Sequence, residues 1–206
     1  MRLVLVSDTH SLHDCCKVPK GDVLIHAGDL TNIGSMEDII KFNEWIGKIK
    51  CRHKLVIAGN HDWGFERNPG PAKKLLTNCT YLMDKKAVID GVVLFGSPWS
   101  PEFCNWAFNL PRGKPLRDKW NKIPENVDVL ITHGPPDGIL DETEEGNRTG
   151  CADLLDVVQK IKPKIHVFGH IHEGYGQVKH GGTTFVNASI CTRRYHPVNE
   201  PIVVDL

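Results

Sequence analysis

Short apolar runs rich in Val, Ile and Leu recur along the 206 residues, and they limit the possible folds more than any other feature. Because the runs are almost continuously apolar, they predict strands that are covered on both faces, as in a buried sheet. The predicted strands are Leu3 to Val6, Val23 to His26, Lys54 to Ile57, Val92 to Phe95, Val127 to Thr132, Ile165 to Phe168, Thr183 to Asn187 and Ile202 to Val204.

Helical patterns lie between several of these runs. Residues Ser35 to Ile49 carry an apolar stripe at helical spacing, and Ser35 with Asp38 three residues later is a typical helix start. A second helix is predicted over Cys151 to Ile161, before Pro163. Strands that alternate with helices predict a layered α/β fold, whereas the helix-poor last third of the chain predicts some antiparallel pairing.

The length and the charge balance exclude several classes of protein. A chain of 206 residues without repeats or linkers predicts one domain, residues 1–206, with a self-sufficient core. Lys plus Arg equals Asp plus Glu at 25 each, so we expect no nucleic-acid partner. No segment approaches the ~20 apolar residues of a membrane span, so we expect no membrane partner either. The sequence sets no oligomeric state.

The cysteines and the N-terminal residues indicate a compartment. Seven cysteines are scattered without a C-x-x-C pair, which favours reduced thiols over a disulfide framework. The first residues turn polar after only a few apolar positions, unlike a signal peptide. We therefore expect a cytoplasmic protein.

Five of the apolar runs lead directly into residues that can bind a metal ion. Ligands of open α/β sheets bind beyond the carboxyl ends of the strands, so we expect these five ends to meet at one site. Each cluster alone is also compatible with a turn or a helix cap, but their coincidence favours a common site. The residues are Asp8 and His10 after the first run, Asp29 after the second, Asn60, His61 and Asp62 after the third, His133 after the fifth, and His170 and His172 after the sixth.

The pair of histidines in "GHIH" raises its own expectation. If the backbone stays extended, His170 and His172 project to the same side, because a strand repeats every two residues. A histidine pair at a strand end is also compatible with a simple polar exit from the core.

The chain resembles the calcineurin-like metallophosphoesterase superfamily motif by motif. The blocks D-x-H, G-D, G-N-H-(D/E), H and G-H-x-H appear in order as "DTH", "GD", "GNHD", "THG" and "GHIH", from Asp8 to His172. Longer stretches, "GSPWSPEFCNWAFN", "LITHGPP" and "HVFGHIHEGYG", are similar to the metallophosphoesterase-domain-containing subgroup. The resemblance implies an αββα sandwich of mixed sheets, with a metal site at the C-terminal ends of strands.

The resemblance also implies a set of metal ligands. One metal ion would be held by Asp8, His10, Asp29 and His172, and a second by Asp29, Asn60, His133 and His170, with Asp29 as the bridge. Some members of the subgroup carry Gly where this chain has His170, so the second site is complete here. Imidazole, carboxylate and amide ligands without thiolate favour two divalent or mixed-valence ions of Mn, Fe or Zn. His61 resembles the histidine that faces the scissile phosphate, as a proton donor or as a stabiliser of charge.

The function implied by this resemblance is metal-dependent hydrolysis of phosphoric esters. The favoured activity is that of a phosphodiesterase on small phosphodiesters such as cyclic nucleotides, through a hydroxide that bridges the two metal ions. A phosphomonoesterase, a nucleotide pyrophosphatase or a protein phosphatase would use the same site. The alternative that is not an enzyme is a metal-binding scaffold like the retromer subunit of this fold, which has an impaired metal-site histidine; no ligand is missing here.

The segment 99–117 is rich in Trp, Phe and Pro and is expected to form a long loop beside the site, a position that lids often occupy. Its aromatic residues could stack on a substrate base, but a hydrophobic cluster that holds the loop down is the favoured interpretation. Arginines are expected to be solvated by default, although they could pair with phosphate. The aromatic residues are Trp99, Phe103, Trp106 and Phe108, and the arginines are Arg112, Arg148, Arg193 and Arg194.

Overall fold

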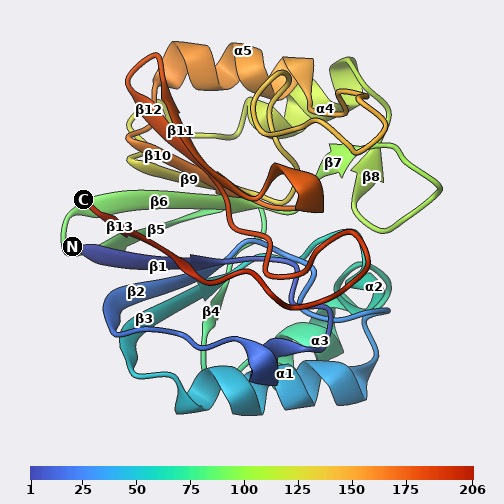
Figure 1. Cartoon of the computed structure of the whole chain (residues 1–206), viewed down its shortest axis with the longest axis vertical. Helices are drawn as coiled ribbons and strands as arrows, with labels where there is room; N and C mark the ends of the chain where they lie inside the picture. Colours follow the sequence, from blue (N-terminus) through green and yellow to red (C-terminus); the bar gives the residue numbers. More distant parts are fainter.

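Two mixed β-sheets lie face to face in the computed structural model, which describes residues 1–206 (Figure 1). The first sheet has the order β13 (Ile202–Asp205), β1 (Arg2–Val6), β2 (Gly21–His26), β3 (Cys51–Val56) and β4 (Thr80–Tyr81). The second has the order β11 (Gly176–His180), β12 (Thr183–Asn187), β10 (Ile165–Phe168), β9 (Val129–Thr132), β6 (Val92–Ser97) and β5 (Lys85–Ile89). All eight predicted strands are present, with ends shifted by a few residues.

Helices cover the outer face of each sheet, which completes the expected αββα layers (Figure 1). The first sheet is covered by α1 (Met36–Lys48), α2 (Trp63–Arg67) and α3 (Pro69–Leu75), and the second by α4 (Lys114–Trp120) and α5 (Ala152–Ile161). Two short 3₁₀ helices, η1 (His13–Cys15) and η2 (His172–Gly174), and a two-stranded ribbon of β7 (Ser100–Pro101) and β8 (Asn109–Leu110) complete the elements. None of the helices has the length and apolarity needed to cross a membrane.

The central strands of both sheets are parallel, and the antiparallel pairs lie at the edges. β13 pairs antiparallel with β1, and β11 pairs antiparallel with β12, which confirms the prediction for the last third of the chain. β5 pairs antiparallel with β6 at the opposite edge of the second sheet.

The apolar runs are buried on both faces, as the sequence predicts. Leu3 and Leu5 pack between the two sheets, whereas Val4 and Val6 from the same strand pack in the cluster that includes residues of α1. A strand in this position has no polar face, which explains the lack of alternation in its sequence. The sequence signal at α1 is also confirmed, because the Ser35 hydroxyl accepts a hydrogen bond from the Asp38 amide at 3.1 Å.

The segment 99–117 differs from its prediction, because it is not one long loop. It contains the paired strands β7 and β8, and α4 begins at Lys114. Pro115 stands in the first turn of α4, and Leu116 and Trp120 bury one face of the helix against the second sheet. The segment considered in the sequence analysis ended at residue 117. It therefore did not include Trp120, and the helical spacing between Leu116 and Trp120 was not recognised.

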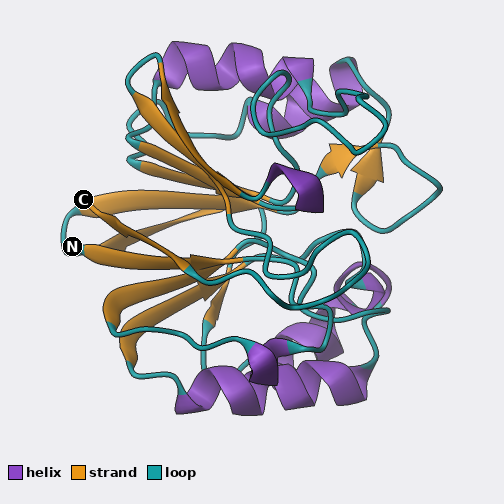
Figure 2. Cartoon of the chain, viewed as in Figure 1, coloured by secondary structure: helices purple, strands orange, loops and turns teal.

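The carboxyl ends of the parallel strands meet at the end of the molecule that lies opposite the chain termini. The loops gather there beside the ribbon of β7 and β8 (Figure 2). The termini lie together at the other end, where the amino group of Met1 donates a hydrogen bond to the carbonyl of Leu206 at 2.9 Å. The fold therefore brings the five predicted polar clusters into one region.

Candidate metal centre

Three groups of potential metal ligands lie where the loops after the parallel strands converge. The ligand atoms within each group lie within 4.8 Å of one another. The groups are Asp8 with His10 and His172, Asp8 with Asp29 and His133, and His10 with Asp29 and His61. Residues from both sheets thus contribute to a single cluster of carboxylates and imidazoles.

The first half of the cluster lies around His172. Its Nε2 atom is 3.4 Å from Asp8 Oδ1 and 3.2 Å from the Nε2 atom of His10. His10 Nε2 is in turn 3.8 Å from Asp29 Oδ2. The donor atoms of these residues point into one small volume.

The second half of the cluster lies around His133. Its Nε2 atom is 2.7 Å from Asn60 Oδ1 and 3.4 Å from Asp29 Oδ2. Asp29 is therefore within reach of both halves, which is the position that a bridging carboxylate requires.

Backbone carbonyls orient three of the histidines. A carbonyl oxygen only accepts hydrogen bonds, so the Nδ1 atom facing it carries the hydrogen and Nε2 is directed toward the cluster. The pairs are His133 Nδ1 with Ala27 O at 3.0 Å, His172 Nδ1 with Thr192 O at 2.9 Å, and His61 Nδ1 with Asn32 O at 2.7 Å. This second layer of contacts is typical of histidines that bind metal ions.

Asp8 and Asp29 are buried, and neither pairs with a lysine or an arginine. Burial acts to raise the pKa of Asp8, but the hydrogen bond and the charge of His172, with the charges of His133 and His10, together hold the pKa well below its usual value. Burial likewise acts to raise the pKa of Asp29, but the surrounding histidines, His133 before His10 and His61, together hold it below its usual value. Two buried carboxylates without a lysine or an arginine partner favour a cation between them.

The pKa values of the same two histidines, His133 and His172, are shifted in the opposite direction. Burial acts to lower the pKa of His133, but Asp29 raises it to about 9, and Asp8 raises that of His172 to about 9. Without metal, a proton on His133 Nε2 would face an amide oxygen and a carboxylate oxygen. These nitrogen and oxygen donors converge on a position that a proton can fill, so their chemistry fits a metal ion that displaces it.

His170 is placed differently from its expectation. β10 ends at Phe168, and the backbone at His170 is left-handed, with φ of 68°, rather than extended. The His170 amide donates to Asp8 at 3.1 Å, which turns the chain out of the strand. The half-buried ring lies 5.0 Å from the ring of His133, outside the three converging groups, and lines the adjacent cavity.

Strained backbone recurs at the residues of the cluster. Asp8, His10 and Asp29 have φ between 43° and 53°, in the left-handed region that non-glycine residues rarely adopt. Each such residue costs on the order of 1–3 kcal/mol and persists only where its surroundings fix it. Here the Asp8 amide donates to Gly28 O at 2.9 Å and the His10 amide donates to Asp29 O at 3.1 Å.

Two glycines allow the carboxylates to approach the backbone. A Cβ atom on Gly59 would lie 2.3 Å from Asp29 Oδ1, and one on Gly169 would lie 1.9 Å from Asp8 Oδ2. Any other residue at either position would push a carboxylate out of the cluster. The glycines of "GNHD" and "GHIH" are therefore part of the site.

Asp62 lies outside the ligand cluster, and its carboxylate connects two loops instead. Its carboxylate accepts hydrogen bonds from the backbone amides of Leu30, Thr31 and Gly59 at 2.9–3.1 Å, and from the Thr31 hydroxyl at 2.7 Å. Burial, followed by the charge of Asp29, raises its pKa to about 6. Asp62 thus joins the loops that follow β2 and β3, which carry Asp29 and His61.

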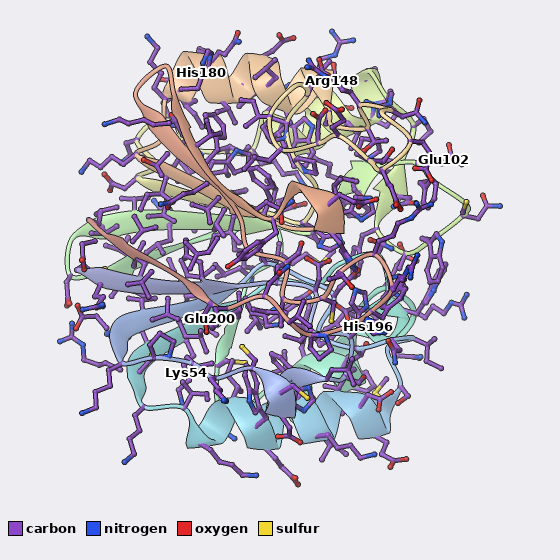
Figure 3. The ribbon with its side chains drawn as sticks, in the orientation of Figure 1. Lys54, Glu102, Arg148, His180, His196 and Glu200 are labelled. Carbon is purple, nitrogen blue, oxygen red and sulfur yellow. The ribbon has the colours of Figure 1, made fainter.

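His61 lies at the open side of the cluster. Its ring is 4.6 Å from that of His10 and stacks on the ring of Trp106, with a centroid distance of 4.3 Å. It lines a cavity of about 550 Å³, together with Phe103, Trp106 and Tyr195. Glu102, on the connection between β7 and β8, also lines this cavity, and Figure 3 labels it beside these two strands.

The segment 99–117 has two kinds of aromatic residue. Trp99 donates from Nε1 to Asp84 at 3.1 Å, and Phe108 is fully buried, so these two hold the segment down as expected. Phe103 and Trp106 instead line the cavity. The interpretation that aromatic residues hold the segment down therefore applies to Trp99 and Phe108, whereas stacking of Phe103 and Trp106 on a substrate base stays a prediction.

The arginines near the cavity already have partners. Arg112 donates to the carbonyls of Gly150 and Thr149 at 2.7 and 2.9 Å. Arg193 forms ion pairs with three carboxylates, those of Glu144, Glu145 and Glu173. Neither Arg148 nor Arg194 lines the cavity.

Residues after β12 also reach the cluster, and the sequence analysis did not assign them to it. The Ser189 hydroxyl donates to Asp8 Oδ2 at 2.9 Å, Thr192 orients His172, and Tyr195 packs against His10 with ring centroids 4.7 Å apart. β12 is another parallel strand of the second sheet that ends in polar residues, "NAS". The rule that ligands bind beyond the carboxyl ends of parallel strands, applied to this run as well, would have found them.

Comparison with known proteins gives relatives over the whole chain. The family model of calcineurin-like phosphoesterases matches residues 1–174. Human metallophosphoesterase domain-containing protein 1 is 50% identical, with coverage of 100% of this chain and 71% of the relative. A Caenorhabditis elegans UPF0046 protein is 42% identical, with coverage of 100% of this chain and 81% of the relative.

Solved structures share the fold at low sequence identity. A sulfate thiohydrolase of Thermus thermophilus aligns with a TM-score of 0.52 and 13% identity, over 91% of this chain and 51% of that chain. Another solved chain aligns with a TM-score of 0.68 and 18% identity, over 90% of this chain and 89% of that chain. These likenesses support the sandwich architecture alone. The match to residues 1–174 and the identity to full-chain relatives decide the family: the chain belongs to the calcineurin-like phosphoesterases, a family of hydrolases.

Proposed function

We propose that this chain is a phosphoesterase with two metal ions, and that its reaction is hydrolysis of small phosphodiesters such as cyclic nucleotides. The observation that carries the proposal is Asp29, a buried carboxylate within reach of both halves of a ligand cluster that no lysine or arginine neutralises. The proposed ligands are Asp8, His10, Asp29 and His172 for one ion, and Asp29, Asn60, His133 and His170 for the other. Mn, Fe and Zn suit this donor set.

Bound metal ions would neutralise the phosphoryl oxygens and lower the pKa of water toward neutrality. The protein contributes the geometry. Carbonyls of Ala27 and Thr192 hold two imidazoles in one tautomer, and Ser189 and the His170 amide hold Asp8. Ligands fixed in this way need little rearrangement when substrate binds.

His61 is the proposed acid. Its Nδ1–H is fixed on the Asn32 carbonyl, so Nε2 is the atom that faces the cavity. From there it can hold a proton and transfer it to the leaving oxygen of the ester. Its stacking on Trp106 keeps the ring in this orientation.

The cavity supports a small substrate. A volume of about 550 Å³ is within the usual range for small-molecule sites, and Phe103 and Trp106 offer aromatic faces on which a planar group can stack. A protein phosphatase acting on folded partners has no need of such a pocket. No residue of the ligand set implied by the family motifs is missing from the sequence, which likewise favours an enzyme over a scaffold.

A substrate screen tests the proposal. The purified chain is loaded with Mn²⁺, Fe²⁺ or Zn²⁺ and assayed on bis(p-nitrophenyl) phosphate, p-nitrophenyl phosphate, cyclic nucleotides and a nucleoside diphosphate. We expect the diesters to be hydrolysed faster than the other esters. Faster turnover of the monoester or the diphosphate would replace the phosphodiesterase activity by one of its alternatives, and no turnover with any metal would favour the scaffold.

Three variants distinguish the effect of the site from that of the rest of the protein in this screen. Asp29→Asn removes a negative charge between two cations, so it should lower turnover more than Asn60→Ala, which removes one neutral ligand. Asp22→Asn, on an exposed carboxylate away from the cluster, should leave turnover unchanged. Near wild-type rates for Asp29→Asn at saturating metal would rule out the bridging role.

A further inference from the structure

The chain segment after β12 folds back over the candidate metal centre and places Tyr195 at its open side. Thr192 organises this turn: its amide donates to His196 O at 2.9 Å, and its carbonyl accepts from the Tyr195 amide at 2.7 Å. The backbone of Tyr195 is left-handed, with φ of 58°. The same Thr192 carbonyl orients His172, so the position of Tyr195 is coupled to that of a proposed ligand.

The Tyr195 ring lies across the imidazoles. It makes edge contacts with His10 at 4.7 Å, with His172 at 5.6 Å and with His61 at 6.1 Å between ring centroids. The side chain remains 43% exposed and lines the cavity. Tyr195 thus contacts two of the proposed ligands, His10 and His172, and also the proposed acid, His61.

The phenol hydroxyl has a single neighbour with which it can form a hydrogen bond, the Nε2 atom of His61 at 3.5 Å. The hydroxyl of Tyr175, which lies between η2 and β11, instead donates to the Glu200 carbonyl at 2.8 Å. Two donor atoms 3.5 Å apart can both reach one oxygen atom that lies between them at the usual distance of about 2.7–3.1 Å. The geometry of Tyr195 and His61 is therefore that of a paired donor site.

We propose, resting on the phosphoesterase function proposed above, that Tyr195 is a second hydrogen-bond donor to the ester oxygen that leaves. A water oxygen forms the new bond to phosphorus and gives a proton to solvent. The bond from phosphorus to the leaving oxygen breaks with its electron pair on that oxygen. His61 supplies the proton from Nε2, and Tyr195 keeps its own proton while its O–H stabilises the negative charge that develops first.

Ion pairs hold the segment in this position before substrate binds. Arg193 precedes Tyr195 by two residues and contacts Glu144, Glu145 and Glu173, which belong to the loop before α5 and to η2. A single exposed ion pair contributes about 0–1 kcal/mol, but a network on one guanidinium restricts it more. A donor that is already in place stabilises a transition state without the cost of reorganisation.

The first test compares Tyr195→Phe with Tyr175→Phe in the metal-loaded chain. Removing one donor of this kind typically lowers kcat by up to about 10²–10³-fold, so Tyr195→Phe should lower kcat at least about tenfold on alkyl esters. The loss should be smaller on nitrophenyl esters, because nitrophenolate leaves without help, and KM should change little. Tyr175→Phe should behave as wild type, and both variants should keep the wild-type metal content.

The second test measures binding without turnover. Orthovanadate adopts the five-coordinate geometry of phosphoryl transfer, whereas inorganic phosphate resembles the product. Tyr195→Phe should weaken inhibition or calorimetric binding of orthovanadate more than that of phosphate, and Tyr175→Phe should change neither.

The outcomes separate the two proposals. Equal behaviour of the two variants, across the leaving-group series and with vanadate, would overturn the role of Tyr195 while leaving the phosphoesterase function intact. A wild-type chain that hydrolyses no ester would overturn the proposed function. The vanadate comparison would then still decide whether Tyr195 contacts a bound anion, and an unchanged affinity would reject that contact.

Discussion

At the level of single residues, a substitution of His61 can distinguish a role in proton donation from a role in metal binding. If its Nε2 protonates the leaving oxygen, His61→Ala should keep both metal ions and slow alkyl esters by about 10²–10⁴-fold, with a much smaller loss on nitrophenyl esters. The measurement is a series of rates against leaving-group pKa, with metal content determined on the same samples. A slope equal to that of wild type would exclude the acid role, and loss of metal would make His61 a part of metal assembly instead.

Because His166 is buried, we expect the free energy of unfolding to depend on pH. The Nε2–H of His166 donates to the Thr132 hydroxyl at 2.8 Å, since that hydroxyl donates its own hydrogen to Gly134 O. Its Nδ1 atom has no partner, so protonation would leave a buried donor unsatisfied. Burial accordingly lowers the pKa of His166 from 6.5 to about 3.

The sign of this effect follows from proton binding. Between pH 6.5 and about 3 the unfolded chain binds a proton that the folded chain does not, so the free energy of unfolding falls as the pH falls. One such histidine contributes about 1.4 kcal/mol per pH unit. His166→Gln, which keeps a donor for Thr132, should have a slope shallower by about this amount in urea titrations with chelator present. Parallel slopes for variant and wild type would contradict the assignment.

Much of the candidate site could be predicted from single residues, because each polar cluster follows a strongly apolar run. Asp8, Asp29 and His133 all lie together, as expected for residues that follow the carboxyl ends of parallel strands. The position of His170 could not be predicted, because it depends on a hydrogen bond from its amide to a carboxylate 162 residues away. The same holds for Asp62, whose partners come from two separate loops and do not follow from local sequence.

At the scale of elements, the close contact between the "GHIH" turn and β1 depends on Gly169. Gly169→Ala would place a methyl group 1.9 Å from Asp8 Oδ2, so it should weaken metal binding and lower stability by about 1–3 kcal/mol. Gly70→Ala in α3 is the matched control, because a Cβ atom there meets nothing within 4 Å and Ala favours a helix. Metal titration and urea unfolding measure both effects, and equal results for the two variants would refute the contact.

Strands buried on both faces could be predicted, whereas the edge strands β4, β5 and β11 could not, and β13 is the one edge strand that was predicted. β1 and β10 consist mostly of buried apolar residues, whereas β5 and β11 are edge strands with mostly polar or exposed residues, so their sequences give little signal. α4 is short, and its buried face becomes visible only when Leu116 and Trp120 are read together. Its tertiary packing against the second sheet, rather than its own pattern, defines it.

At the scale of the whole molecule, we propose that residues 1–206 unfold as one unit. The apolar cluster between the sheets includes Leu5 from the first sheet and Val167 from the second, so neither sheet retains its core alone. Because this core needs no metal, chelation should abolish activity while a single unfolding transition remains. Circular dichroism and activity, followed together during chelator titration, check this prediction. Loss of secondary structure together with activity would contradict it.

The number of metal ions bound per chain is the sharpest check of the two-metal site. The two halves of the cluster share Asp29, so we expect about two ions per chain after reconstitution, and fewer for Asp29→Asn under the same conditions. Elemental analysis of the folded, dialysed protein measures this number without assuming any substrate. A folded chain that binds one ion or none at saturating metal would contradict the two-metal site.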